Sequence, residues 1–212
     1  MSVRVKICGI NTREAAAAAA DADFIGLVFY PPSPRALGFD AAAAIAATAP
    51  PKPRRVGLFV DADDETIGRA IAAAALDLLQ LHGRESPARA AALKARFGKP
   101  VIKAIPVAAA ADLAAATPYL GKVDYLLFDA KPPARPDALP GGNAEAFDWR
   151  LLAGRSWPVP WLVSGGLTPE NVAEAVRVSG AAAVDVSSGV EDRPGRKNPA
   201  RIAAFLAAAR RL

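Results

Sequence analysis

Two glycine-bearing segments near the end of the chain have the residue types that bind an anion. Residues 161–171 read Trp-Leu-Val-Ser-Gly-Gly-Leu-Thr-Pro-Glu-Asn, and residues 183–191 read Ala-Val-Asp-Val-Ser-Ser-Gly-Val-Glu. Each is an apolar strand that runs into small residues, so backbone N–H groups lie uncovered where the strand ends. Gly165 with Gly166, and Ser188 with Gly189, therefore predict a phosphate site. Either segment taken alone could equally be a simple tight turn.

Cys8 and Asp129 are the candidates for proton transfer, because each ends a short apolar segment with a titratable side chain. Strand periodicity places Lys6 on the same face as Cys8, and a neighbouring ammonium favours a thiolate with a pKa below the ~8.5 of a free thiol, whereas burial of the charged form would raise the pKa. Asp129 follows a mostly apolar run, so its carboxylate must be paired or functional. The alternatives are an inert core cysteine and an ion pair between Asp129 and Lys103 or Lys131.

Three more polar residues stand where strands are expected to end or to face inward. His82 follows Leu-Gln-Leu and is the only histidine, which excludes a histidine-based metal cluster; it is expected to form a wall of the site or to bind substrate. Arg35 ends a proline-rich loop, where its guanidinium is either held ready for a substrate carboxylate or solvated. Asp185 is expected in the interior as the partner of Lys6 or Lys103.

The elements that must position these side chains alternate between strands and helices along the whole chain. Short apolar segments predict eight strands, at residues 3–8, 24–29, 55–60, 78–81, 101–105, 125–129, 161–164 and 183–186. Helices are expected between them, at residues 12–22, 39–49, 63–75, 86–97, 109–116, 171–179 and 198–211. Thr168 is expected to cap the helix after the seventh strand, and Asn198, followed by Pro199, is expected to cap the last helix. This order predicts an α/β protein, a single (β/α)8 barrel domain over residues 1–212 with a parallel eight-stranded sheet. In such a barrel the active site lies at the carboxyl ends of the strands.

Composition and charge narrow the class of partner. The chain has 212 residues, a formal net charge of +5 and 52% hydrophobic residues, which suits a large core and a small anionic substrate. Basic residues occur in pairs, such as Arg54 with Arg55, and not in runs interleaved with aromatics, so nucleic acid is not expected to bind. The first residues have no apolar leader, and no segment reaches the length of a membrane span, so a cytoplasmic protein is predicted. One cysteine excludes an internal disulfide framework.

Several segments, in order along nearly the whole chain, together resemble phosphoribosylanthranilate isomerase of tryptophan biosynthesis. They are residues 5–10 (Val-Lys-Ile-Cys-Gly-Ile), 26–30, 33–35, 56–60, 79–83 (Leu-Gln-Leu-His-Gly), 127–129, 147–149, 162–167 and 184–190. The resemblance implies a single (β/α)8 barrel that converts N-(5-phosphoribosyl)anthranilate to the 1-deoxyribulose phosphate by an Amadori rearrangement, without a metal or cofactor. Carried over by motif, Cys8 is the general base, Asp129 the general acid and Arg35 the residue near the anthranilate carboxylate. The two glycine-bearing turns match the phosphate site.

Two departures from the family pattern stand out. Residues 141–146 read Gly-Gly-Asn-Ala-Glu-Ala where the family usually has a second glycine and a basic residue, and the segment between Cys8 and Phe24 is about two residues short. Two other functions remain open on the same residues. One is a different sugar-phosphate isomerase or epimerase, which would not need Cys8 and Asp129 together; the other is a binding protein for phosphoribosyl ligands that has lost catalysis. A monomer or a homodimer fits equally.

Overall fold

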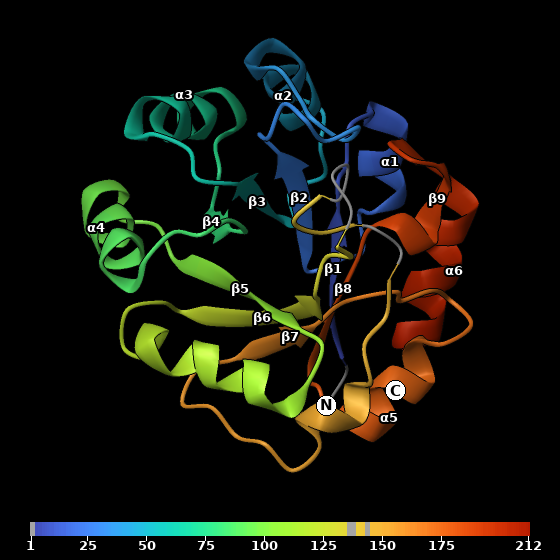
Figure 1. The fold of residues 1–212 in the computed structure, drawn as a ribbon. Helices are drawn as coiled ribbons and strands as arrows, with labels where there is room; N and C mark the ends of the chain where they lie inside the picture. Colours follow the sequence, from blue (N-terminus) through green and yellow to red (C-terminus); the bar gives the residue numbers. More distant parts are fainter. Residues whose placement is uncertain (1–2, 135–138, 143–144) are drawn as a thin grey trace.

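A computed structural model describes residues 3–134, 139–142 and 145–212. Eight parallel strands close into a barrel in chain order, with β8 pairing back onto β1, as Figure 1 shows from one end. The predicted (β/α)8 architecture is therefore confirmed, and strand bounds differ from the expected ones by at most two residues. The strands are β1 (Arg4–Cys8), β2 (Phe24–Val28), β3 (Arg54–Phe59), β4 (Leu78–Leu81), β5 (Val101–Val107), β6 (Tyr125–Ala130), β7 (Trp161–Val163) and β8 (Ala183–Val186).

Helices form the outer layer around this barrel (Figure 1). The α-helices are α1 (Arg13–Ala18), α2 (Phe39–Ala46), α3 (Asp64–Ala74), α4 (Pro87–Phe97), α5 (Val172–Ser179) and α6 (Pro199–Ala209). Three further helical segments are 3-10 helices, η1 (Ala110–Tyr119), η2 (Trp149–Leu152) and η3 (Ser188–Val190), and a small hairpin of β9 (Glu191–Arg193) and β10 (Arg196–Lys197) follows β8. None of the helices in the described ranges has the length and apolar character needed to cross a membrane.

Polar residues before each helix explain where most of the helices begin. The side chains of Thr12, Asp63, Ser86 and Asn198 each accept a hydrogen bond from a backbone N–H three residues later, at 2.8 to 3.1 Å. Such a bond satisfies a donor that the first helical turn leaves unpaired. The expected Asn198 cap is therefore confirmed, whereas α1 ends at Ala18, four residues earlier than expected.

The helix after β7 begins later than the sequence suggested. Thr168 was expected to be its cap, but Asn171 is the residue before the first turn and α5 begins at Val172. The Asn171 side chain accepts from the Thr168 N–H at 2.7 Å and donates to the Gly166 carbonyl at 2.9 Å. These two bonds hold residues 166–171 as a turn, so Pro169 falls in that turn and not in the helix.

The barrel interior is apolar at one end and polar at the other. Side chains from the amino-terminal halves of the strands form one buried cluster, which contains Phe24, Val56, Leu78, Ile102, Ala104, Leu127, Leu162 and Ala183. Toward the carboxyl ends the buried side chains that face inward include Lys6, Gln80, Asp129 and Asp185. The amino-terminal end is thus a packed floor, and the chemistry is confined to the opposite end, as expected for this fold.

Candidate active site

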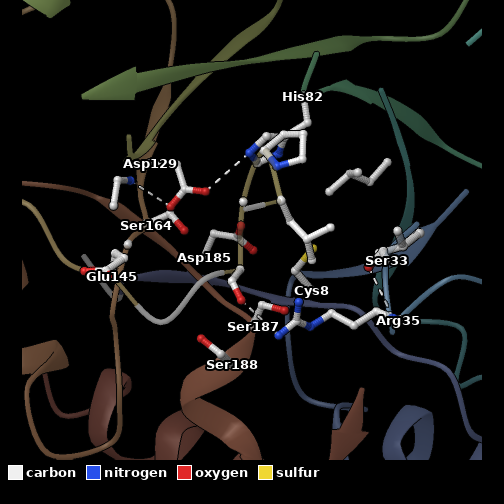
Figure 2. A pocket seen from close by; sticks show the side chains of 18 of the residues that line it. Cys8, Ser33, Arg35, His82, Asp129, Glu145, Ser164, Asp185, Ser187 and Ser188 are labelled. Atoms are coloured by element: carbon white, nitrogen blue, oxygen red, sulfur yellow. Dashed lines mark hydrogen bonds and ion pairs between the residues drawn. The ribbon is translucent and has the colours of Figure 1, made fainter. Parts of the chain in front are cut away.

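A pocket of about 740 Å³, counted to its open mouth, lies at the carboxyl ends of the strands. All the predicted site residues except Gly189 line it, and they come from opposite walls of the barrel: Cys8 from β1, Arg35 after β2, His82 after β4, Asp129 in β6, and the turns after β7 and β8 (Figure 2). The pocket also includes residues that sequence reasoning did not assign to a ligand, among them Tyr30, Ser33, Glu145, Ser164, Asp185 and Ser187.

Cys8 sits above a buried ion pair. Lys6 is completely buried and donates to the Asp185 carboxylate at 2.9 Å, which confirms that Asp185 is an interior partner of Lys6. Burial alone would lower the pKa of Lys6, but Asp185 and Cys8 reverse this effect and hold its pKa above the usual value. Lys6 therefore remains an ammonium directly below the thiol, and its charge is largely balanced by Asp185.

The pKa of Cys8 shifts in the direction that burial gives, and not in the direction that Lys6 alone would give. Burial disfavours the thiolate more than Lys6 and Lys197 favour it, and the Asp185 carboxylate opposes it further, so the pKa of Cys8 lies above its usual value. The sequence placed Lys6 correctly and offered Asp185 as one of its partners, but it could not weigh burial against these charges. The thiolate of Cys8 is therefore a stronger base than the thiolate of a free cysteine, but a smaller fraction of the protein carries it at neutral pH.

Asp129 is held on both carboxylate oxygens. Its Oδ1 accepts from the N–H of Ala130 at 2.9 Å, and its Oδ2 lies 3.3 Å from Nε2 of His82 (Figure 2). The other ring nitrogen of His82, Nδ1, lies 2.9 Å from Nε2 of Gln80. Asp129, His82 and Gln80 thus form a continuous polar chain along one wall, in which Gln80 was not foreseen.

The alternative partners considered for Asp129 are engaged elsewhere. Lys103 alternates to the outer face of β5, where it pairs with the buried Glu85 at 2.8 Å and donates to the Gly83 carbonyl at 2.7 Å. Lys131 lies 3.8 Å from Asp112. Lys103 is for the same reason not the partner of Asp185. The carboxylate of Asp129 faces the pocket beside His82, without a lysine partner among the described residues.

Arg35 is buried and already paired, which differs from a guanidinium held ready on a solvated loop. Its Nε and one terminal nitrogen each donate to the Glu191 carboxylate at 2.8 Å, and the same terminal nitrogen lies 3.2 Å from the Gly142 carbonyl. Glu191 also accepts from Lys197 at 2.6 Å. The second terminal nitrogen of Arg35 has no hydrogen-bond partner among the described residues and is available to a ligand there. Figure 2 shows this side chain extending beside Cys8.

Glu191 and Lys197 belong to the hairpin after β8 and were not predicted as site residues. Despite partial burial, which opposes ionisation, Arg35 and Lys197 hold the pKa of Glu191 below its usual value. Burial lowers the pKa of Lys197, although Glu191 opposes this shift. Lys197 also donates to the Ser187 carbonyl at 2.9 Å. No sequence pattern separates this lysine from the other basic residues of the chain, because its burial comes from the hairpin.

The turns predicted to bind phosphate differ in how they contribute. Gly165 and Gly166 both have positive φ, at 81° and 65°, and neither N–H donates to another residue in the described part of the chain. Two successive amides of this kind can bind an anion. Gly189 instead allows close packing, since a Cβ there would lie 1.8 Å from the Leu167 carbonyl oxygen. Gly189 thus brings the two turns together, and Ser188 reaches the pocket.

The loop after β6 covers the pocket from one side. A Cβ at Gly141 would lie 2.6 Å from Nε2 of His82 and 2.8 Å from Oδ2 of Asp129, so the backbone there passes directly over that pair. Glu145 lines the pocket from the same loop. Of the altered segment at residues 141–146, Asn143 and Ala144 lie outside the described residues.

Comparisons with known proteins agree with this geometry. A family model described as N-(5′phosphoribosyl)anthranilate (PRA) isomerase matches residues 5–208. The N-(5′-phosphoribosyl)anthranilate isomerase of Paramagnetospirillum magneticum is 56% identical over 212 residues, covering 99% of this chain and 98% of that protein. The isomerase of Rhodospirillum centenum is also 56% identical, over 99% of both chains.

Solved structures give the same result. The crystal structure of phosphoribosyl anthranilate isomerase from Thermotoga maritima superposes with a TM-score of 0.86 and 37% identity, covering 99% of this chain and all of the other. A phosphoribosyl anthranilate isomerase in complex with reduced 1-(o-carboxyphenylamino)-1-deoxyribulose 5-phosphate has a TM-score of 0.83 and 36% identity over 99% of this chain and 100% of that one. Sequence, barrel and relatives agree along the full length, and the chain belongs to the N-(5′-phosphoribosyl)anthranilate isomerase family.

Proposed function

We propose that the barrel catalyses the Amadori rearrangement of N-(5′-phosphoribosyl)anthranilate to 1-(2-carboxyphenylamino)-1-deoxyribulose 5-phosphate, an aldose–ketose isomerisation of tryptophan biosynthesis, with Asp129 as the acid and Cys8 as the base. Family membership supports the activity. The observation that carries the residue assignment is that a thiol on β1 and a carboxyl group on β6 line the same pocket from different walls. A sugar ring between them is in reach of both groups.

The two ends of the substrate fix its orientation. The phosphate binds at the turns of Gly165–Gly166 and Ser188, which line the pocket and where the two glycine amides have no hydrogen-bond partner among the described residues. The anthranilate carboxylate binds to the free terminal nitrogen of Arg35 at the opposite side. His82 forms the wall between them. Fixing both ends converts the proton transfers into reactions between groups already in place.

The reaction then needs one acid and one base from the protein and no cofactor. Asp129 gives its proton to the furanose ring oxygen, the bond from C1 to that oxygen breaks, and the nitrogen lone pair forms a protonated Schiff base. The thiolate of Cys8 removes the proton from C2, and the electrons of that C–H bond form an enolamine. The enolamine then loses the proton of its C2 hydroxyl and gains a proton at C1, which gives the 2-ketone, and proton exchange with water returns Asp129 to the acid and Cys8 to the thiolate. Because the pKa of Cys8 is raised, the thiolate fraction should increase with pH above neutrality.

Loss of anthranilate-type fluorescence from phosphoribosylanthranilate made in situ tests this function. The wild-type protein should accelerate the loss, and Cys8→Ser and Asp129→Asn should each lower kcat about 10²- to 10⁴-fold, the usual contribution of one proton transfer. Product affinity should stay within about tenfold, since neither group holds the ligand. Asp148→Asn, the same chemical change at an exposed carboxylate on the outer layer, serves as the control and should keep full activity.

The outcomes separate the competing functions. No enzyme-dependent fluorescence loss while the substrate survives would exclude the isomerase. Ligand binding without turnover would indicate a binding protein, and turnover that persists in Cys8→Ala would point to a different base.

Four further expectations remain predictions: a single domain over residues 1–212, a monomeric or homodimeric state, a cytoplasmic location and the absence of nucleic-acid binding. Size-exclusion chromatography with light scattering measures the oligomeric state.

A further inference from the structure

Gln80 is a buried polar residue that the proposed mechanism does not use. It lies in the middle of β4 with no exposed surface, between Leu58 of β3 and Ile102 of β5 in the sheet register. Its Nε2 contacts Nδ1 of His82 at 2.9 Å, and its Oε1 has no hydrogen-bond partner among the described residues. A buried polar atom without a partner is costly, so this side chain is retained at an energetic disadvantage.

The contact with Gln80 decides which nitrogen of His82 carries the proton. An amide N–H₂ can only donate, so Nδ1 must accept and the proton of the neutral ring must lie on Nε2. Nε2 is the atom that faces Oδ2 of Asp129, at 3.3 Å. In this arrangement the protonated Nε2 of His82 lies 3.3 Å from Oδ2 of Asp129, and its charge distribution, together with the N–H of Ala130, favours the carboxylate. This arrangement suits Asp129 after it has given its proton to the substrate. It does not suit Asp129 before that step, when the carboxyl group must hold the proton.

The reverse orientation of the amide suits the state that holds one more proton. Rotation of the Gln80 amide by 180° would place Oε1 against Nδ1, where an oxygen can only accept. Nδ1 would then carry a proton, and one further proton would be shared between Nε2 of His82 and Oδ2 of Asp129. Because Oε1 has no partner among the described residues, the rotation would break only the hydrogen bond with His82, and the amide N–H₂ would take the unpartnered position of the oxygen.

We propose that Gln80 is a positioning residue for the acid: its amide donates to His82 when the His82–Asp129 pair lacks the catalytic proton and reverses to accept when the pair holds it. The inference rests on the proposed role of Asp129 as the acid.

The charged and titratable groups around the His82–Asp129 pair come from three parts of the site. They are Asp185 of β8 with Cys8 and Lys6 of β1, Arg35 and Glu145 at the mouth, and Asp61, Glu85 and Lys103 around the turn at Gly83.

The chain offers a direct measurement, because His82 is its only histidine. After labelling with ¹⁵N-histidine, two-bond ¹H–¹⁵N spectra of the whole protein report which ring nitrogen carries the proton, with no assignment needed. In its neutral form, the wild-type ring should hold its proton on Nε2, with Nδ1 in a hydrogen bond. Gln80→Glu should move the proton to Nδ1, since a carboxylate can only accept.

Gln80→Met gives a second arm that introduces no buried charge. Its expected effect is loss of the hydrogen-bonded Nδ1 signal, with a mixture of the two tautomers. The control is Ile102→Met, the same new side chain at the neighbouring position of the interior, which should leave the His82 spectrum unchanged. Ring signals that are identical in wild type, Gln80→Glu and Gln80→Met would overturn the inference.

Kinetics connect the tautomer to the acid. Gln80→Met should lower kcat about tenfold, the effect of losing one hydrogen bond to a buried polar group, with KM changed less than about threefold and the acid limb of the pH profile shifted. In an Asp129→Asn background the same substitution should have no further effect, because Gln80 acts only through that carboxyl group. An additional loss in that background would overturn the inference. Inactivity of the wild-type protein would instead remove the proposed function and leave the tautomer result standing.

Discussion

Two buried groups of charges flank Cys8, and they differ in how the charges are matched. Below the thiol, Lys6 has one carboxylate to itself, Asp185 at 2.9 Å. At the mouth, two cations share one carboxylate, since Glu191 bonds to both Arg35 and Lys197. The interior pair is neutral and the rim group carries one excess positive charge. The excess charge therefore lies where an anionic substrate enters, and the neutral pair lies where the chain is least accessible to solvent.

This difference predicts which substitutions affect folding and which affect the ligand. Loss of one member of a one-to-one buried pair leaves the other charge unpaired, which is among the most destabilising changes known for a polar contact. Loss of one cation from the rim leaves Glu191 with the remaining cation. Substitutions in the interior pair should therefore mainly lower the stability of the fold, and substitutions in the rim group should mainly weaken ligand binding.

The largest effect is expected at Lys6. Lys6→Met should lower the free energy of unfolding by about 3 to 5 kcal/mol, because the carboxylate of Asp185 loses its partner in a buried site. Urea denaturation followed by tryptophan fluorescence measures this change. Lys6→Met/Asp185→Asn is the matched control and should recover much of the loss, since the second change removes the unpaired charge. If Lys6→Met lowers the free energy of unfolding no more than Arg35→Met does, the interior pair and the rim group do not differ in the way proposed.

A smaller effect is expected at the rim, and mainly on binding. Arg35→Met should weaken product-analogue binding by about 1.5 to 3 kcal/mol, the usual value of a hydrogen bond to a charged group. The fold should tolerate the change better than Lys6→Met, because Glu191 keeps Lys197 at 2.6 Å. Isothermal titration calorimetry gives the affinity, and Arg193→Met on the exposed part of the same hairpin is the control. Unchanged affinity would remove Arg35 from the ligand site.

The smallest effect concerns the thiol between the two groups. Cys8 is the only cysteine, so alkylation by iodoacetamide reports on one position. Since burial raises its pKa despite Lys6 and Lys197, the rate should still be rising above pH 9, where a free thiol with a pKa of about 8.5 is already largely ionised. Mass spectrometry follows the reaction. A rate that levels off below pH 8 would show that the two lysines outweigh burial.

Ligand protection provides the control for the alkylation experiment. A phosphorylated product analogue bound at the turns of Gly165–Gly166 and Ser188 would cover Cys8, which lines the same pocket. Modification should then slow strongly at saturation, and inorganic phosphate should protect less because it reaches only one end of the site. Equal rates with and without the analogue would place the thiol outside the substrate path.

Much of the fold follows from patterns that are local in sequence. Eight short apolar segments separated by helical stretches specify parallel strands covered on both faces, and the expected cap at Asn198 forms. The alternation of side chains along β1 also placed Lys6 and Cys8 together on the interior face. The expected helix at residues 171–179 agrees with α5 within one residue, but the Thr168 cap was wrong, because the Asn171 side chain bonds back to Gly166 and Thr168 and a cap signal at Thr168 does not reveal that competition.

The sequence by itself determined the barrel and its polar end, and residue type and local periodicity made Cys8, Asp129 and the two glycine-bearing turns candidate site residues. The roles of base and acid came from the family resemblance. Only the tertiary structure decided their electrostatics. Asp185 balances Lys6, the hairpin brings Glu191 and Lys197 to Arg35, and Gln80 contacts His82 next to Asp129. These effects depend on burial and on distances between residues up to 179 positions apart in the sequence. The electrostatic energy of a buried charged group is set mainly by its nearest partners, which residue type alone does not reveal.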